Sequence, residues 1–369
     1  MAGFLSPLTL PRKLQELPPQ DARFCLAIER FIASELEADV SGGNVLVAFS
    51  GGADSCALLL SLFYLAPRLG IAVGAAHVDH RLRPSSGEEA EACRQFAQLL
   101  GIPFHHQAFD VSELSRKHKI GIEECARNVR HAFLKKTAQA EGYGYVAFGH
   151  TLNDLAEDVL MRLIRGAGWP GLGGMPGMRP FADFGKEEPD SQSSYILRPL
   201  LGTSRSAIES FLGNFHFTWV EDESNSDASY LRNRVRHSIL PLFTAENPAF
   251  LESVANIWRL GRMDASFFED ILARVEPAIE QSKEDEEATL FISTQELSGL
   301  HKSLRLRLYK QCLAALGPGQ ALLSNLFAID DAWLKRSQSG ARDTRHQFPG
   351  GKTALVSRKG IRFLVATAT

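Results

Sequence analysis

Six consecutive residues, Ser50 to Ser55, form a glycine-containing segment whose chemistry suits a phosphate group. They read SGGADS and lie between the apolar run VLVAF and an apolar stretch that starts near Cys56. Gly51 and Gly52 allow a tight turn that exposes backbone N–H groups, and a helix that starts there adds partial positive charge. We therefore predict that a phosphate or pyrophosphate binds to Ser50, Gly51, Gly52, Ala53, Asp54 and Ser55.

The acidic residue Asp54 distinguishes this segment from a Walker loop, which has a lysine there to reach the outer phosphates. A carboxylate among phosphates requires a cation between them, so Asp54 is predicted to bind or position magnesium. The alternative is a plain glycine turn in which Asp54 and Ser55 cap the next helix. The strand before the segment and the helix after it favour phosphate binding.

A second group of ionisable residues lies in GHTLNDLAEDVLMRLIRGAG, at 149–168. The spacing of Asp154, Glu157 and Asp158 predicts that they share one face at the start of a helix. Acidic residues at that end are also explained by the helix dipole alone. Because His150 ends the preceding apolar run, we instead predict a carboxylate site for a metal ion or an ammonium group.

Arginines in two further segments are candidates for binding anions. Arg127 and Arg130 are three residues apart, and Arg232 and Arg236 are four apart, on a helical face with Asn233. Guanidinium groups hold phosphate or carboxylate through two parallel hydrogen bonds. Each pair is equally compatible with a solvated helix face, where ion pairs contribute little.

The elements that must position these residues belong to an α/β domain. Between Asn44 and Ile164, short β-branched runs alternate with longer amphipathic segments, which is typical of a parallel sheet wrapped by helices. The apolar runs at 45–49, 71–77 and 145–150 are predicted to be central strands. We predict a Rossmann-like open parallel sheet.

Chain length and charge indicate a second domain. The 369 residues exceed the usual size of a single core. The formal net charge is −3, but residues 301–369 hold 12 Lys or Arg and three Asp, a balance of +9. We predict a catalytic domain at 1–240 and a smaller, mainly helical C-terminal region at 241–369. Its basic end suits contact with a polyanion, and an ordinary solvated surface explains the same charge.

Composition narrows the class of protein. Hydrophobic residues at 44% and charged residues at 22% are near globular averages and argue against disorder, collagen or a coiled coil. The five cysteines form no CxxC pair and are predicted to be reduced and buried. No apolar run approaches the roughly 18 residues that span a bilayer, and no signal peptide is recognisable. We expect a cytoplasmic protein with no membrane partner.

The segment SGGADS resembles the PP-loop of the N-type ATP pyrophosphatases, and four further segments resemble the tRNA(Ile)-lysidine synthetases. These are HVDHRLRP at 77–84, GIEECARNVRHAFL at 121–134, the acidic segment at 149–168, and LRPLL at 197–201 with WVEDESNSDASYLRNRVRHSILP at 219–241. Three positions depart from the family pattern. Asn153 stands where the family has Asp, Asp158 where it has Thr, and Asp79 where it more often has Asn.

This resemblance implies that ATP adenylates the wobble cytidine in the CAU anticodon of tRNA(Ile). L-lysine then attacks through its ε-amine, giving lysidine, AMP and pyrophosphate. ATP and magnesium are the implied cofactors. The implied catalytic residues are Asp54, Arg127, His150, Asp154 and Glu157. His77 joins the loop residues as a nucleotide ligand, and Asp54 and Asp154 are the implied magnesium ligands. Arg130, Arg198, Arg232, Asn233 and Arg236 are implied to contact tRNA or lysine.

Several alternatives stay open at this point. The lysine amine must lose a proton, and Asp154, Glu157 and His150 are equal candidates for the base. Other PP-loop reactions such as tRNA 2-thiolation or amide synthesis are possible, although thiolation usually needs paired cysteines. A nucleotide-binding RNA adaptor without catalysis is a further alternative. The oligomeric state is open, with a homodimer among the alternatives.

Overall fold

A computed structural model describes residues 10–181, 194–215, 219, 230–275, 280–284, 287–319, 321–339 and 342–365. The chain forms two compact units, residues 1–260 and 261–369, with α10 (Phe250–Val275) running through the division. The proposed domain limit at residue 240 is therefore earlier in the chain than this structural division. The DESN sequence at 222–225 lies outside the described residues.

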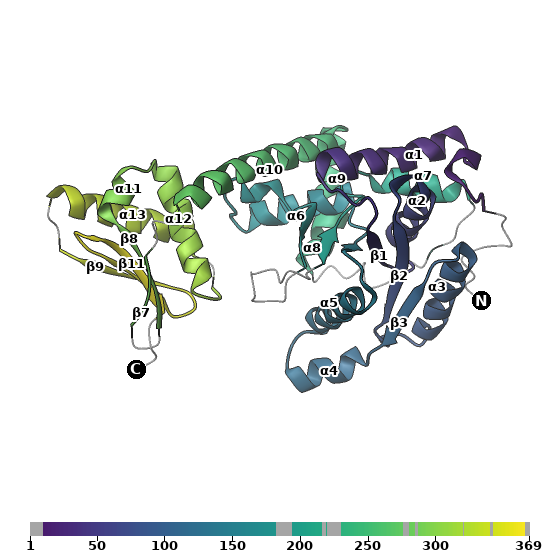
Figure 1. The fold of residues 1–369 in the computed structure, drawn as a ribbon, viewed down its shortest axis with the longest axis horizontal. Helices are drawn as coiled ribbons and strands as arrows, with labels where there is room; N and C mark the ends of the chain where they lie inside the picture. The colour runs from purple at the N-terminus through teal and green to yellow at the C-terminus, as the bar shows by residue number, and fades with distance from the viewer. Residues whose placement is uncertain are drawn as a thin grey trace. The chain divides into compact units, whose positions relative to one another are not determined.

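The first unit contains a six-stranded sheet in the order β3-β2-β1-β4-β6-β5 (Figure 1). Its parallel strands are β1 (Asn44–Ala48), β2 (Ala72–Asp79), β3 (Phe104–Ala108), β4 (Tyr145–Ala147) and β6 (Tyr195–Leu197). The edge strand β5 (Met178–Pro180) is antiparallel to β6. The prediction of an open, Rossmann-like parallel sheet is confirmed. As in other such sheets, the carboxyl ends of the strands meet at one edge, where ligands bind.

Both faces of this sheet are buried, as expected for parallel strands. Along β1, Val45 and Val47 face one hydrophobic cluster and Leu46 faces another. The first cluster contains most of α2, and the second contains residues of α5. The helices of the unit are α1 (Pro19–Arg30), α2 (Ala53–Leu69), α3 (Ser86–Leu100), α4 (Val111–His118), α5 (Ile122–Glu141), α6 (Leu152–Ile164), α7 (Arg205–Gly213), α8 (Leu231–Arg234) and α9 (Leu240–Glu246), with a π-helical turn η5 (Val235–Ile239) between the last two.

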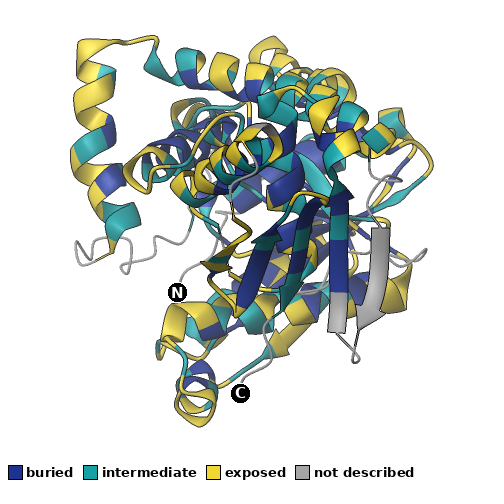
Figure 2. Cartoon of the chain, turned by 90° about the vertical axis from the view of Figure 1, so that its left-hand side faces the viewer, coloured by how far each residue is buried: buried dark blue, intermediate teal, exposed yellow. Residues whose placement is uncertain are grey.

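The second unit combines helices with a five-stranded antiparallel sheet in the order β7-β8-β11-β10-β9. The helices contribute more residues than the strands, in agreement with a mainly helical region, but the sheet itself was not predicted. The elements are β7 (Glu280–Glu284), β8 (Glu287–Ser293), α11 (Thr294–Ser298), α12 (Lys302–Ala315), α13 (Leu323–Ser339), β9 (Thr344–Phe348), β10 (Lys352–Val356) and β11 (Gly360–Val365). Buried residues follow its central strands (Figure 2).

A buried cation stabilises this second unit. The Nζ of Lys352, a residue only 1% exposed, donates hydrogen bonds of 2.8 Å to the carbonyl oxygens of Leu313, Gly317 and Gly319. These carbonyls lie at and beyond the end of α12, where helix carbonyls have no partner inside the helix. Lys352 thus caps α12 from β10. None of the helices in the described ranges has the length and apolar character that crossing a membrane requires.

Candidate active site

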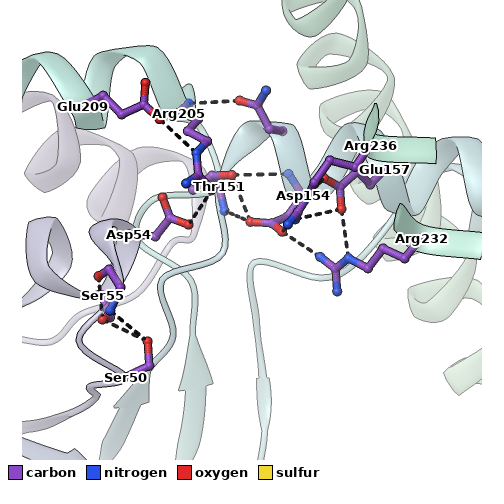
Figure 3. Close-up of polar contacts among 12 residues, drawn as sticks. Ser50, Asp54, Ser55, Thr151, Asp154, Glu157, Arg205, Glu209, Arg232 and Arg236 are labelled. Carbon is purple, nitrogen blue, oxygen red and sulfur yellow. Dashed lines mark hydrogen bonds and ion pairs between the residues drawn. The ribbon is translucent and has the colours of Figure 1, made fainter. Parts of the chain in front are cut away.

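The turn between β1 and α2 is closed by its own serines (Figure 3). Ser55 Oγ accepts a hydrogen bond of 3.1 Å from the N–H of Gly51 and donates one of 2.9 Å to the carbonyl of Gly52. Gly51 has φ +83, in the left-handed region that favours glycine. Gly52 precedes α2 without a capping side chain. The start of α2 therefore faces the turn as an anion-binding helix terminus.

Two residues from neighbouring strands support this turn. His77, buried on β2, places Nδ1 2.9 Å from the carbonyl oxygen of Phe49, the residue before the turn. A carbonyl only accepts, so Nδ1 donates, and burial lowers the pKa of His77 and keeps the ring neutral. Gly149, after β4, packs so closely that a Cβ there would lie 3.1 Å from the carbonyl carbon of Asp54. His77 is thus next to the loop, in a supporting position.

Asp54 has two carboxylate oxygens in different surroundings. Oδ1 is buried and has no hydrogen-bond partner among the described residues, whereas Oδ2 lies 3.8 Å from Nη1 of Arg205. Burial raises the pKa of Asp54 to about 6, the charge of Asp154 adds to the rise, and Arg205 and Arg236 oppose it. A buried oxygen without a donor is costly. This carboxylate is therefore suited to a cation that arrives with a ligand.

Sequence reasoning missed Arg205 and left Asn153 unexplained. Arg205 is the first residue of α7, and its Nε also bonds Glu209 Oε1 at 3.0 Å. A cation at the positive end of a helix is unfavourable unless an acid is near, and that local signal could have indicated a role. Asn153 Oδ1 accepts a 2.9 Å hydrogen bond from the backbone N–H of Arg205. Asn153 therefore ties the start of α6 to α7.

The acidic residues of α6 form a cluster with the arginines that follow Tyr230 (Figure 3). Glu157 Oε1 accepts from Arg236 Nε at 2.6 Å, and Oε2 accepts from Arg232 Nε at 2.8 Å. Asp154 Oδ1 accepts from Arg232 Nη2 at 2.6 Å and from Arg236 Nη2 at 3.3 Å. Its Oδ2 accepts from the backbone N–H of Thr151, at 2.8 Å, and from the Thr151 hydroxyl, at 2.9 Å. The structure thus joins two sets that were predicted separately.

Ion pairing explains why Asp154 is ionised in this cluster. Burial alone would raise the pKa of Asp154, but the charge of Arg232 and further interactions with His150 and Thr151 outweigh it and lower the pKa. The carboxylate therefore stays ionised. Asp158 was predicted to share this face, but it bonds Arg162 Nε at 2.8 Å instead. The spacing along α6 alone could not show that Glu157 joins the cluster and Asp158 does not.

His150, Arg198, Arg127 and Arg130 lie near the ends of β4 and β6 and on α5. Arg198 Nε donates to His150 Nδ1 at 3.1 Å and its Nη1 donates to the carbonyl of Pro176 at 2.7 Å. Burial, followed by the charge of Arg198, lowers the pKa of His150 to about 3. A histidine with so low a pKa is a weak base. Arg127 and Arg130 are exposed on α5.

The arginine-rich turn also contains Asn233, at an intermediate level of burial on α8 between Arg232 and Arg236. Arg232 and Arg236 were predicted to contact tRNA or lysine. In this arrangement both are instead occupied by the acids of α6. An ammonium group could replace a guanidinium at those carboxylates, since both are cationic donors. The cluster therefore has the chemistry of an amine-binding site that carries its own counter-ions.

Comparison with known proteins identifies the family. Residues 25–243 match the PP-loop domain family. The tRNA(Ile)-lysidine synthase of Nitratidesulfovibrio vulgaris is 43% identical over 87% of this chain and 91% of its own length. The corresponding enzyme of Geobacter sulfurreducens is 36% identical over 81% of this chain and 61% of its own length. This chain belongs to the tRNA(Ile)-lysidine synthase family.

A further lysidine synthase matches a shorter part of this chain. The tRNA(Ile)-lysidine synthase of Thermosipho africanus is 37% identical over 63% of this chain, and the chain spans about half, 53%, of that relative. Among solved structures, the U34-tRNA thiolase NcsA of Methanococcus maripaludis superposes with a TM-score of 0.53, covering 66% of this chain and 80% of its own. Its identity of 18% shows a shared fold alone.

Of the two magnesium ligands implied for a lysidine synthase, Asp54 fits the role and Asp154 does not. The buried, unpartnered Oδ1 of Asp54 is a hard oxygen donor of the kind that magnesium prefers. Asp154 does not fit, because its oxygens already accept from Thr151 and from two guanidinium groups that repel a cation. Within the described ranges, no group of three or more His, Cys, Asp or Glu side chains could hold a metal. Magnesium bound to phosphates needs only one or two carboxylates.

Proposed function

We propose that this protein is an ATP-dependent ligase that joins L-lysine to the wobble cytidine of tRNA(Ile) with a CAU anticodon. In the first step, the cytidine carbonyl oxygen attacks the α-phosphorus of ATP and expels pyrophosphate. In the second, the ε-amine of lysine attacks the activated ring carbon, and AMP leaves with the former carbonyl oxygen. The observation that carries the proposal is the lysine-free PP-loop at the start of α2, together with the buried Asp54 oxygen that has no hydrogen-bond partner among the described residues.

The loop and Asp54 act on the phosphates. Backbone N–H groups at the start of α2 would hold the pyrophosphate portion of ATP, whose negative charge grows as the bond to the α-phosphorus breaks. Asp54 is the residue that would hold magnesium, which neutralises phosphate charge when bound. Arg205, whose Nη1 lies 3.8 Å from Asp54 Oδ2, would add positive charge beside it. We propose that Arg127 also contacts the phosphates. We expect most of the rate to come from positioning the two reactants.

The acids of α6 act on lysine. We propose that the ammonium of lysine competes with Arg232 and Arg236 for Asp154 and Glu157. Departure of an arginine raises the proton affinity of the carboxylate that it leaves, which is what a general base requires. Burial and then the charge of Arg198 lower the pKa of His150 to about 3, and lysine at the α6 acids would not displace Arg198. The pKa of Asp154 is lowered as well, against the effect of burial, chiefly by Arg232, which lysine would displace. This leaves Asp154 or Glu157 to accept the amine proton.

The remaining basic residues would bind tRNA. We propose that Arg130 and Arg198 contact it, together with Arg232, Asn233 and Arg236 once the acids have lysine as a partner. The same proposal places the protein in the cytoplasm, where its substrates tRNA, ATP and lysine occur together. The five cysteines are free and buried, as a reducing compartment allows.

A product assay tests the proposal. Purified protein is incubated with ATP, magnesium, lysine and tRNA(Ile) transcript, and the digested RNA is analysed by mass spectrometry alongside AMP release. We expect a lysine-bearing cytidine and one AMP for each, and loss of both in Asp54→Asn. AMP release without any change in the RNA would contradict it. Glu29→Gln, far from the loop, serves as the control and should retain activity.

A further inference from the structure

We propose that Arg179, Arg198 and His131, beside Arg127, form a phosphate site for the tRNA backbone next to the nucleotide site. The proposal rests on the function proposed above and names residues that it does not use: Arg179 on β5 and His131 on α5. Arg127 and His131 lie on α5, Arg179 lies on the edge strand β5, and Arg198 directly follows β6, which pairs with β5. No single motif in the sequence contains them together.

Packing contacts place these groups in one neighbourhood. The His131 ring meets Phe181, two residues after Arg179, and stacks on Phe148, whose ring stacks on His150, the hydrogen-bond partner of Arg198. Desolvation, followed by the charge of Arg127, lowers the pKa of Arg179. Desolvation also lowers the pKa of Arg198 to about 10, and both Arg179 and Arg127 add to the effect. Several positive charges held close together away from water repel one another, which lowers the stability of the folded state. Natural proteins accept such a cost mainly at functional sites, where an anion can relieve it.

Among the residues that the structure describes, neither Arg179 nor Arg198 has a carboxylate hydrogen-bond partner. Arg198 is 8% exposed, and both of its hydrogen bonds go to neutral acceptors, His150 Nδ1 and the Pro176 carbonyl. Asp158 attracts it from a distance but bonds Arg162. Arg179 is half-buried and makes no ion pair or hydrogen bond with any residue that the structure describes. Phosphate is the natural ligand for arginines in this state, because it accepts several charge-assisted hydrogen bonds.

His131 completes the site as a neutral group. Its ring stacks on Phe148 at 5.6 Å between centroids and meets Phe181 edge-on at 5.5 Å, which fixes its orientation. Desolvation, followed by the charges of Arg130 and Arg127, lowers its pKa to about 4. The ring is therefore uncharged at neutral pH and adds no repulsion.

The position of the site favours RNA over ATP as the source of the phosphate. The PP-loop follows β1, and Arg179 lies on β5, three strands away in the order β1-β4-β6-β5. With strands about 4.8 Å apart, the two positions are separated by roughly 14 Å. Pyrophosphate held at the loop is too short to span that gap. A polynucleotide presents successive phosphates and can place one at β5 while its target base lies at the loop.

Substitution of Arg179 tests the site. Affinities for tRNA(Ile) and, separately, for ATP are measured for wild type, Arg179→Ala, Arg179→Lys and the control Arg23→Ala, an exposed arginine on α1. We expect Arg179→Ala to weaken tRNA binding about tenfold and to reduce the salt slope by about 0.7–0.9, as loss of one phosphate contact predicts. ATP affinity should not change, and Arg179→Lys should recover part of the loss.

Two results would overturn the proposal. One is tRNA affinity and salt slope equal to wild type in Arg179→Ala. The other is weakened ATP binding with unchanged tRNA binding, which would make this a nucleotide site. Far-UV circular dichroism checks that the variants are folded, and recovery in Arg179→Lys separates lost charge from lost packing. Failure of the wild-type protein to form lysidine would refute the proposed function. The comparison of tRNA affinities between wild type and the Arg179 variants would still test whether this site binds phosphate.

Discussion

Replacing Glu157 by Gln is the sharpest test of the cluster on α6. The Glu157 side chain is 1% exposed and accepts three guanidinium hydrogen bonds, of 2.6 Å and 3.1 Å from Arg236 and 2.8 Å from Arg232. Gln preserves the shape and one acceptor oxygen but removes the negative charge. Two arginines would then share Asp154 alone. The substitution therefore isolates the ionic part of the cluster.

The expected cost follows from burial. Removing one partner of a fully buried ion pair costs about 3–5 kcal/mol because the other charge is left without compensation. Here the Arg232 and Arg236 side chains are 42% and 26% exposed, so water can partly solvate them. We discount the cost accordingly, to about 2 kcal/mol, which corresponds to roughly 30-fold in the folding equilibrium.

The assay combines urea unfolding with hydrogen exchange. Because the chain has two units, a single transition is not assumed, and exchange of α6 amides reports on the first unit directly. Amides that exchange through unfolding of that unit should exchange roughly 30-fold faster. The matched control is Glu29→Gln, which breaks the more exposed pair with Arg68 and should cost below about 1 kcal/mol.

The result that would refute this reasoning is equal destabilisation by the two substitutions. A double-mutant cycle with Arg236→Gln adds a second criterion, since contacting charges should couple by at least about 0.5 kcal/mol. Coupling near zero would show that the hydrogen bonds between Glu157 and Arg236 contribute nothing net. If Glu157 also receives lysine, the same substitution raises the KM for lysine and leaves ATP binding unchanged.

Two further substitutions test supports of the fold and the loop. Gly149→Ala places a methyl group against the backbone of Asp54, so ATP binding should weaken about fivefold. The control Gly144→Ala, whose added methyl meets no atom within 4 Å, should bind ATP normally, and equal affinities of the two variants in an ATP titration would contradict this packing argument. Lys352→Met leaves one buried and two partly buried carbonyls without their donor and should destabilise the second unit by about 2 kcal/mol in urea unfolding. Lys335→Met, on an exposed part of α13, should change stability little, and matching midpoints would show that the cap is dispensable.

The phosphate-binding turn could be predicted from sequence because its physical basis is local. Ser50 to Ser55 lie between one strand and one helix, and the glycines, the serines and the helix terminus are all within a few residues of one another. Hydrophobic periodicity likewise indicated the parallel sheet, since strands buried on both faces are apolar throughout. The antiparallel sheet of the second unit was not predicted, and its edge strand TRHQF at 344–348 carries mostly polar residues that give no strand signal.

The tertiary structure determined which polar side chains pair with one another. Arg232 lies 78 residues from Asp154, and Asn153 lies 52 from Arg205, and no spacing rule connects residues that far apart. The sequence alone determined which groups carry charge and which segment can turn around a phosphate. Only folding decided which acids meet which arginines, which carboxylate oxygen of Asp54 has no donor, and that the strand of Arg179 pairs with the strand before Arg198. Charge interactions act through distance in space, and the order of strands in the sheet sets those distances.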